Sequence, residues 1–235
     1  MELNAYFKRG LKDSVPIMIS FFFVFSALGA LYHERGYHFF DTALGTIAIF
    51  AGPLQISLVD ILARGQVLTA LALTVLVNFR FLFMAMVASQ YFKGVSKVKV
   101  FLSLQMFSAS TYAVSHAHFQ SEKVNDGESQ FRYFLGVAAP SYGVAVLATI
   151  IGYLGVSYFN YSSVALFAAM VLPIHFTALT AKNSKKGFTV LATVLGGIGA
   201  PILVNHSEWL MVLVPVACGV SLAAFETKRQ SKEAV

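Results

Sequence analysis

An arginine lies within one of the apolar stretches of this chain. Arg80 follows Asn78 and is the only charged residue between positions 65 and 92. A charged side chain at such a place is costly in a membrane, and it usually faces a cavity or an anionic partner. A guanidinium can bind a carboxylate through two parallel hydrogen bonds. Asn78 and Arg80 therefore predict part of a solute site. The alternative is that Arg80 snorkels to the membrane interface.

A second group of candidates follows the proline in Gly52-Pro53-Leu54-Gln55. Proline removes a backbone donor and clashes with the preceding helical turn, so it kinks or breaks a helix. Freed carbonyls at membrane depth are tolerated where they line a cavity, and helix breaks of this kind form solute sites in transporters. Gln55 adds an amide donor and acceptor near the break. An ordinary kink with Gln55 in an interhelical hydrogen bond is an equally good interpretation.

Pro173 and His175 repeat this pattern later in the chain, although a single histidine on an apolar helix is more often structural. Asp60 is the best-placed carboxylate for proton coupling, and its alternative is a simple interfacial position. His116 and His118 lack a third ligand of suitable type and spacing, so we expect no metal. Sequence signatures of enzymes and of nucleotide cofactors are also missing. We therefore expect a protein that is not an enzyme, with no catalytic residue and no cofactor.

The elements that carry these residues belong in a lipid bilayer. Hydrophobic residues make up 57% of the 235 positions and charged residues only 12%, against about 25% charged residues in soluble domains. The net charge is +6, but lysine and arginine occur in short clusters between apolar runs. This is typical of the loops of a membrane protein and gives no reason to expect nucleic acid as a partner.

A transmembrane helix needs about 20 mostly apolar residues. The uncharged runs predict an all-α, polytopic transmembrane bundle of about seven or eight spans, forming a single membrane domain over residues 1–235. The expected spans are 14–32, 42–62, 66–90, 100–119, 133–156, 162–181, 187–204 and 209–225. The span at 100–119 is the most polar, and the span at 187–204 is rich in glycine.

The placement of lysine and arginine favours both termini on the cytoplasmic side, because short cytoplasmic loops are rich in these residues. With eight spans, Arg64 falls on the inner side and Lys93, Lys97 and Lys99 fall on the outer side. This basic outer loop is the one conflict. A re-entrant neighbouring segment would resolve it, but would move Lys182–Lys186 outside.

Residues 10–90 and 136–205 show a weak internal similarity. Each segment begins with glycine and proline, and each has a second helix with a Phe-Ala start and a proline, at Pro53 and Pro173. The two units are four spans apart, so a repeat would be parallel, with a broken second helix in each half. Chance similarity between apolar helices is the alternative.

The order of these motifs resembles the AzlC family, the large subunit of bacterial branched-chain amino acid exporters. The resemblance rests on Phe50-Ala51-Gly52-Pro53-Leu54-Gln55, on Asn78-Phe79-Arg80 one helix later and on Phe134-Leu135-Gly136, and it covers residues 5–225. The chain departs from the family at Pro53, where relatives more often have a small residue. It also departs at Ser108-Ala109-Ser110-Thr111-Tyr112, which lacks an acidic pair that relatives commonly carry.

The resemblance implies a secondary transporter in the bacterial inner membrane that exports valine, leucine, isoleucine or methionine. It also implies a small AzlD-like membrane subunit as partner; a higher oligomer is left open. Arg80 or a half-helix N-terminus would hold the substrate carboxylate, and carbonyls near Gly52 and Pro53, with Gln55, would accept from its ammonium group. The alternatives are a scaffold or enzyme subunit that transports nothing, and a passive channel for small solutes.

Overall fold

The computed structural model describes residues 2–121, 126–156 and 170 of the chain. Within these ranges it contains seven α-helices, one short 3-10 helix and no β-strand. The prediction of an all-α membrane bundle is therefore confirmed.

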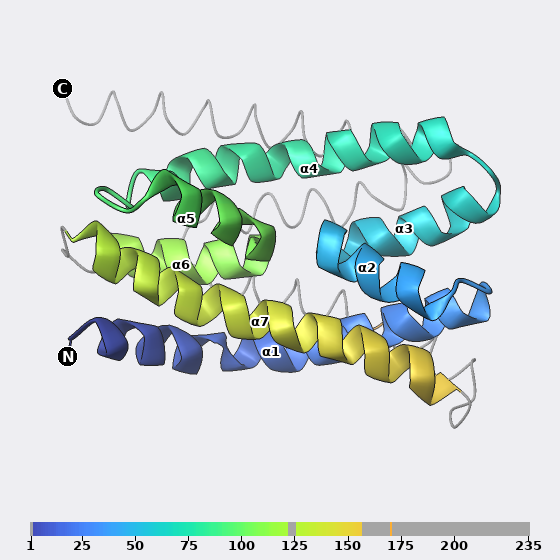
Figure 1. Ribbon diagram of the computed structural model, residues 1–235, viewed down its shortest axis with the longest axis horizontal. Coiled ribbons are helices and arrows are strands. Elements are labelled where there is room, and N and C mark those ends of the chain that lie inside the picture. Colours follow the sequence, from blue (N-terminus) through green and yellow to red (C-terminus); the bar gives the residue numbers. More distant parts are fainter. Residues whose placement is uncertain (1, 122–125, 157–169, 171–235) are drawn as a thin grey trace. The chain divides into compact units, whose positions relative to one another are not determined.

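Three of the helices are long and apolar enough to cross a bilayer: α1 (Glu2–Glu34), α4 (Val67–Ser89) and α7 (Gly127–Gly155). Helices α1 and α7 lie side by side, and α4 runs back in the opposite direction (Figure 1). These helices cover the expected spans 14–32, 66–90 and 133–156, except for positions 66, 90 and 156 at the span ends. Each is longer than a span requires, which suits a helix that tilts or extends into the interface.

Glycines set the packing of α1 against α7. Gly10 lies against the backbone of Tyr133 and Gly136, and Gly152 lies against the backbone of Ser26. A Cβ at either glycine would collide with the backbone of the neighbouring helix. The two helices are therefore parallel and touch at both ends, in the manner that small residues allow between membrane helices.

The expected span 42–62 is two short helices, α2 (Phe39–Ile49) and α3 (Gly52–Ala63). The chain turns between them and returns to the end from which α2 started. There, the Tyr37 hydroxyl donates to the carbonyl of Val59 at 3.0 Å, and Arg35 pairs with Asp60 at 2.8 Å. We name residues 39–63 the first hairpin. A single helix that crosses the membrane was therefore the wrong expectation for this segment.

Local chemistry explains this break. Phe50 ends α2 in the left-handed region, at φ 44° and ψ 44°, a conformation that stops a helix. Pro53 then falls in the first turn of α3, where its missing N–H costs nothing and its fixed φ suits a helix start. Pro53 thus begins a helix instead of kinking one.

The expected span 100–119 is also interrupted. It consists of α5 (Lys97–Ser103), the 3-10 helix η1 (Leu104–Met106) and α6 (Ala109–Ser121). The chain turns at the extended residue Phe107. Ser108 then caps α6, because its Oγ accepts from the N–H of Thr111 at 3.2 Å while Thr111 Oγ1 accepts from the N–H of Ser108 at 2.9 Å. We name residues 97–121 the second hairpin.

The second hairpin starts and ends beside the C-terminal end of α4. Phe119, near the end of α6, packs edge-to-face against Phe92, with ring centroids 5.7 Å apart. The first hairpin is anchored at the other end of the bundle. The two hairpins therefore enter from opposite ends and meet tip to tip between the long helices (Figure 1).

The described residues thus contain an inverted arrangement of two similar units. Each unit has a long helix followed by a hairpin, α1 with α2–α3 and α4 with α5–α6, and the two units run in opposite directions. The tips read Phe50-Ala51-Gly52 and Phe107-Ser108-Ala109, a phenylalanine followed by two small residues in both. The predicted parallel repeat needs residues 136–205, most of which lie outside the described ranges, so it stays a prediction.

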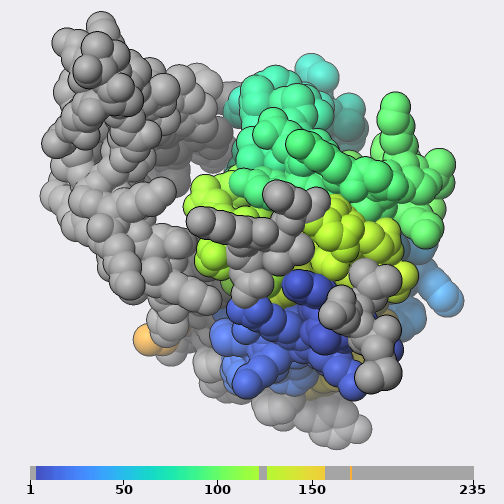
Figure 2. Space-filling view, turned by 90° about the vertical axis from the view of Figure 1, so that its left-hand side faces the viewer, coloured from blue at the N-terminus to red at the C-terminus, as the bar shows by residue number. Residues whose placement is uncertain are grey.

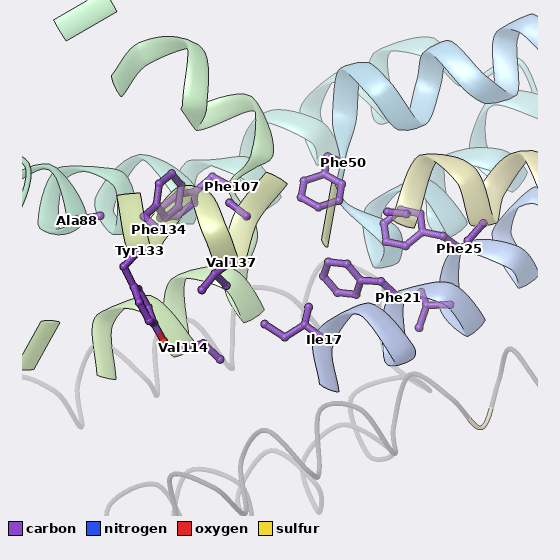
Figure 3. Close-up of a cluster of buried hydrophobic side chains, with 14 of the residues drawn as sticks. Ile17, Phe21, Phe25, Phe50, Ala88, Phe107, Val114, Tyr133, Phe134 and Val137 are labelled. Atoms are coloured by element: carbon purple, nitrogen blue, oxygen red, sulfur yellow. The ribbon is translucent and has the colours of Figure 1, made fainter. Parts of the chain in front are cut away.

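Aromatic contacts fix both tips against the long helices. Phe50 stacks on Phe25 at 5.9 Å and meets Phe21 edge-to-face at 5.8 Å. Phe107 packs against Phe134 at 5.9 Å and Phe81 at 6.5 Å. Figure 3 shows the two groups, Phe50 with Phe21 and Phe25, and Phe107 with Phe134. The phenylalanine that ends each half-helix is therefore also the side chain that holds its tip in place.

The hairpins change how the charged loops are distributed. The backbone of Lys93 lies against Gly127 at the start of α7, so the α4–α5 connection is at the same end as the N-terminus. Figure 2 looks onto this end, where the start of α1 and the segments around α5 and α7 come together. The structure reverses the sequence-based placement of Lys93, Lys97 and Lys99 opposite the N-terminus. Arg64 moves to the far end with Arg35.

Candidate functional site

The two hairpin tips meet through a side chain of the second hairpin. Gln105 Nε2 donates to the carbonyls of Ile47 at 2.6 Å and Ala48 at 2.9 Å. From α7, the Tyr142 hydroxyl donates to the same Ile47 carbonyl at 2.8 Å. These carbonyls belong to the last turn of α2, where the helix supplies no further N–H groups. The end of α2 is therefore satisfied by groups from two other elements.

The start of α3 is buried except for Pro53 and has no side-chain cap. Ala51, the residue before it, offers no capping side chain, and Pro53 has no N–H. The N–H of Gln55 donates to the carbonyl of Ala51 at 2.9 Å. Within the described part of the chain, the N–H groups of Gly52 and Leu54 have no acceptor, although both residues are buried. Such an end carries partial positive charge and is suited to bind an anion.

Gln55 lies across the break from the end of α2. Its side chain is 0% exposed, and its Nε2 donates to Thr46 Oγ1 at 3.1 Å. Thr46 in turn shares a hydrogen bond of 3.2 Å with Thr149 of α7, and the Tyr32 hydroxyl of α1 lies beside the Gln55 amide. Gln55 Oε1 is buried and has no hydrogen-bond partner. An acceptor buried in this state is costly, which makes Gln55 Oε1 a candidate acceptor for a ligand donor.

The break therefore places two opposite half-helix ends next to each other. Only Phe50 and Ala51 separate the carbonyl end of α2, which is partly negative, from the amide end of α3, which is partly positive. An amino acid zwitterion also carries one negative and one positive group. Around the break the walls are apolar and aromatic, formed by Val24, Phe21, Phe25, Phe50 and Tyr142. The partial charges and the apolar walls of the break are complementary to a small zwitterion that has an apolar side chain.

Asn78 and Arg80 do not converge on one point. Phe81, which lies three residues after Asn78 on the same face of α4, packs against the first hairpin, and Asn78 Oδ1 is buried without a hydrogen-bond partner. Arg80 is exposed, and its guanidinium lies 4.9 Å from the centre of the Phe81 ring. Asn78 therefore belongs beside the first hairpin, and Arg80 is oriented differently.

Asp60 lies at the far end of the first hairpin, paired with Arg35, with both side chains almost half exposed. The adjacent Tyr37 has a raised pKa, first because of its partial burial and then because of the negative charge of Asp60, while Arg35 acts in the opposite direction. Pro173 and His175 lie outside the described residues. Across the ranges that the structure describes, no three His, Cys, Asp or Glu side chains form a group that could bind a metal.

Sequence reasoning missed several polar residues at this site: Thr46, Gln105, Tyr142 and Thr149. Thr46 and Thr149 are 103 positions apart, so their contact leaves no local pattern. Gln105 was visible only as one of several polar residues that weaken the expected span 100–119. A polar side chain in an otherwise apolar stretch of sequence was the available signal.

The fold and the site define a polytopic helical membrane protein with opposed re-entrant hairpins around a buried polar break. The chain belongs to the AzlC family: the model of the AzlC protein matches residues 16–159. This match contains both hairpins and most of the three long helices. No solved structure matches the chain.

Three relatives align along most of their length. An uncharacterized membrane protein of Archaeoglobus fulgidus is 26% identical, with 84% of each chain covered. The inner membrane protein YgaZ of Escherichia coli is 26% identical, over 95% of this chain and 91% of its own. The branched-chain amino acid transport protein AzlC of Bacillus subtilis is 24% identical, over 93% of this chain and 85% of its own.

Proposed function

We propose that this protein is a secondary transporter that exports branched-chain or similar hydrophobic amino acids across a bacterial inner membrane. The observation that carries this proposal is the buried break between α2 and α3, with its uncapped α3 start and the unsatisfied Gln55 Oε1. The name of the Bacillus subtilis relative, a branched-chain amino acid transport protein, supports the same substrate class. On this reading the protein carries a solute and is not an enzyme.

The partial charges of the two half-helix ends determine how the amino acid substrate lies in the break. The substrate carboxylate accepts from the free N–H groups of Gly52 and Leu54, helped by the positive end of α3. The ammonium group donates to Gln55 Oε1 and to carbonyls at the end of α2. The branched aliphatic side chain of the substrate then packs on Phe25 and Phe50, which buries its apolar surface and requires no hydrogen-bond partner.

Orientation follows from the charged loops. The N-terminal end of the bundle carries most of the lysines and arginines in the described helix ends and loops, namely Lys8, Arg9, Lys12, Lys93, Lys97, Lys99 and Arg132. The far end carries Arg35 and Arg64. Because positive loops stay on the cytoplasmic side, we place the N-terminal end there and the open end of the first hairpin outside. The hairpins thus remove the conflict at Lys93–Lys99.

Asp60 remains our candidate for proton coupling. It is a carboxylate at the outer end of the first hairpin, and its partner Arg35 holds it at 2.8 Å. A proton taken up by Asp60 would weaken this ion pair, which joins the end of α3 to the α1–α2 connection. Transport driven by a proton gradient would then act directly on the anchor of the first hairpin.

A small AzlD-like subunit is the proposed partner, and α4 is the surface we assign to it. The face of α4 with Leu71, Val75, Phe79 and Phe83 is exposed, and Arg80 lies within the same helix. A guanidinium at membrane depth needs an acceptor, and within the described residues its contact is the Phe81 ring. A partner helix with a carboxylate or free carbonyls would supply that acceptor.

Efflux from vesicles tests the proposal. Purified chain is reconstituted with and without the small subunit, the vesicles are loaded with labelled valine, and release is followed with and without a proton gradient. We expect saturable release that needs both subunits and is accelerated by the gradient. Release that does not saturate and ignores the gradient would indicate a passive channel. Absence of release under all conditions would favour a scaffold or enzyme subunit.

A further inference from the structure

Gln105 joins the two hairpins at the carbonyls that an ammonium group would need. Its Nε2 donates to Ile47 and Ala48, at 2.6 and 2.9 Å. In the described ranges, these are the direct hydrogen bonds between the first and second hairpins. The side chain of Gln105 is exposed, whereas Gln55 on the other side of the break is fully buried. Gln105 can therefore leave its place without opening the core.

We propose that the Gln105 amide stands in for the ammonium group of the substrate and is displaced when an amino acid binds. This inference rests on the proposed function. Both groups present N–H donors, but the ammonium carries a full positive charge, which the negative end of α2 favours. Hydrogen bonds from a charged donor are about twice as strong as those of a neutral amide. The substrate ammonium therefore displaces the Gln105 amide from these carbonyls.

Displacement of Gln105 has a consequence for the second hairpin. Once the amide leaves Ile47 and Ala48, the two tips are no longer hydrogen-bonded to each other. The hairpins are anchored at opposite ends of the bundle, so release lets one move without the other (Figure 1). Binding of an ammonium group thus breaks the hydrogen bonds that join the two hairpins. An acid of the same shape without this group binds at the α3 end but leaves the hydrogen bonds of Gln105 in place.

Two ligands separate this role from a structural one. L-valine and isovalerate have the same carbon chain and carboxylate, but isovalerate lacks the ammonium group. Binding of each is measured to the purified full chain with its small subunit, for the wild type, Gln105→Ala and Gln105→Met. Gln66→Ala is the matched control, because Gln66 is an exposed glutamine between α3 and α4, away from the tips.

We expect both Gln105 variants to bind valine about 3- to 10-fold more tightly, since about 1 kcal/mol of competing hydrogen bonding is removed. Isovalerate affinity should stay within about twofold of the wild type, which also shows that the variants are folded. Gln66→Ala should change neither affinity.

The possible results separate this inference from the proposed function. If the wild type binds no valine, the proposed function itself fails. If the wild type binds valine, weaker or unchanged valine binding in both variants overturns only the displacement of Gln105. An equal change for both ligands, or loss of both in both variants, overturns it as well, because Gln105 would then support the structure and not compete with the ammonium group.

Discussion

Gln55 donates to Thr46 across the break of the first hairpin, from Nε2 to Oγ1 at 3.1 Å. This hydrogen bond ties the first turn of α3 to the last turn of α2. It uses one N–H donor of the amide and leaves the carbonyl Oε1 buried and without a hydrogen-bond partner. The orientation of one side chain therefore both closes the hairpin and leaves an acceptor for a ligand.

Substitution of Gln55 tests this double role. We expect Gln55→Ala to reduce valine efflux at least tenfold, because a lost hydrogen bond to a charged ligand costs about 1.5–3 kcal/mol. Efflux from loaded vesicles measures it, with the amount of folded protein checked by gel filtration. Gln66→Ala, an exposed glutamine far from the break, serves as control and should transport normally. Undiminished efflux in Gln55→Ala would remove this residue from the site.

Two glycines of α7 offer a matched pair for stability. A Cβ at Gly152 would collide with the backbone of Ser26, whereas one at Gly143 would meet nothing within 4 Å. Gly152→Ala should therefore destabilise the protein by about 1–3 kcal/mol, the usual cost of overpacking. Gly143→Ala should be neutral or stabilising by up to about 1 kcal/mol, because alanine is the better helix former. Thermal unfolding in detergent compares them, and equal melting temperatures would contradict the close contact of α1 and α7.

The start of α7 should respond to pH. Asp126 caps this helix, and its pKa lies below the ordinary 3.8, chiefly because the Ser129 hydroxyl donates to its carboxylate and then because of backbone N–H donors. A lowered pKa stabilises the folded state above the ordinary value. This stability is lost as the pH falls through the lowered pKa.

Melting temperatures measured between about pH 7 and pH 3 check this expectation. Asp126→Ala should melt lower than the wild type at neutral pH, and the gap should narrow in acid. Asp126→Asn keeps an acceptor at the cap without the charge, so its melting temperature should depend less on pH than that of the wild type. A constant gap between wild type and Asp126→Ala over the whole range would rule out the cap as its origin.

Arg80 should matter for assembly. If its guanidinium binds the small subunit, Arg80→Gln should reduce the amount of that subunit that purifies with the chain, while the chain itself stays folded. Arg64→Gln changes another exposed arginine, in the turn between α3 and α4, and should leave the complex intact. Full recovery of the complex with Arg80→Gln, together with lost efflux, would instead return Arg80 to substrate binding.

The sequence by itself determined the solvent and the class of structure. An apolar chain with few charges has to be in lipid, and a backbone in lipid has to satisfy its hydrogen bonds within helices. The break at Gly52–Gln55 was also visible, because proline acts on its own neighbours and needs no distant partner. These features depend on local chemistry, so composition and a few residues were enough to predict them.

Only the tertiary structure decided where the chain turns back. A broken helix that continues across the membrane and one that returns as a hairpin have the same local sequence. What separates them is distant contact, such as Phe50 with Phe21 and Phe25, or Arg35 with Asp60. In lipid, buried and exposed faces are both apolar, so hydrophobic periodicity carries little information about packing. The meeting of Gln105 with the end of α2 joins residues 57 and 58 positions apart, and only the folded chain brings them together.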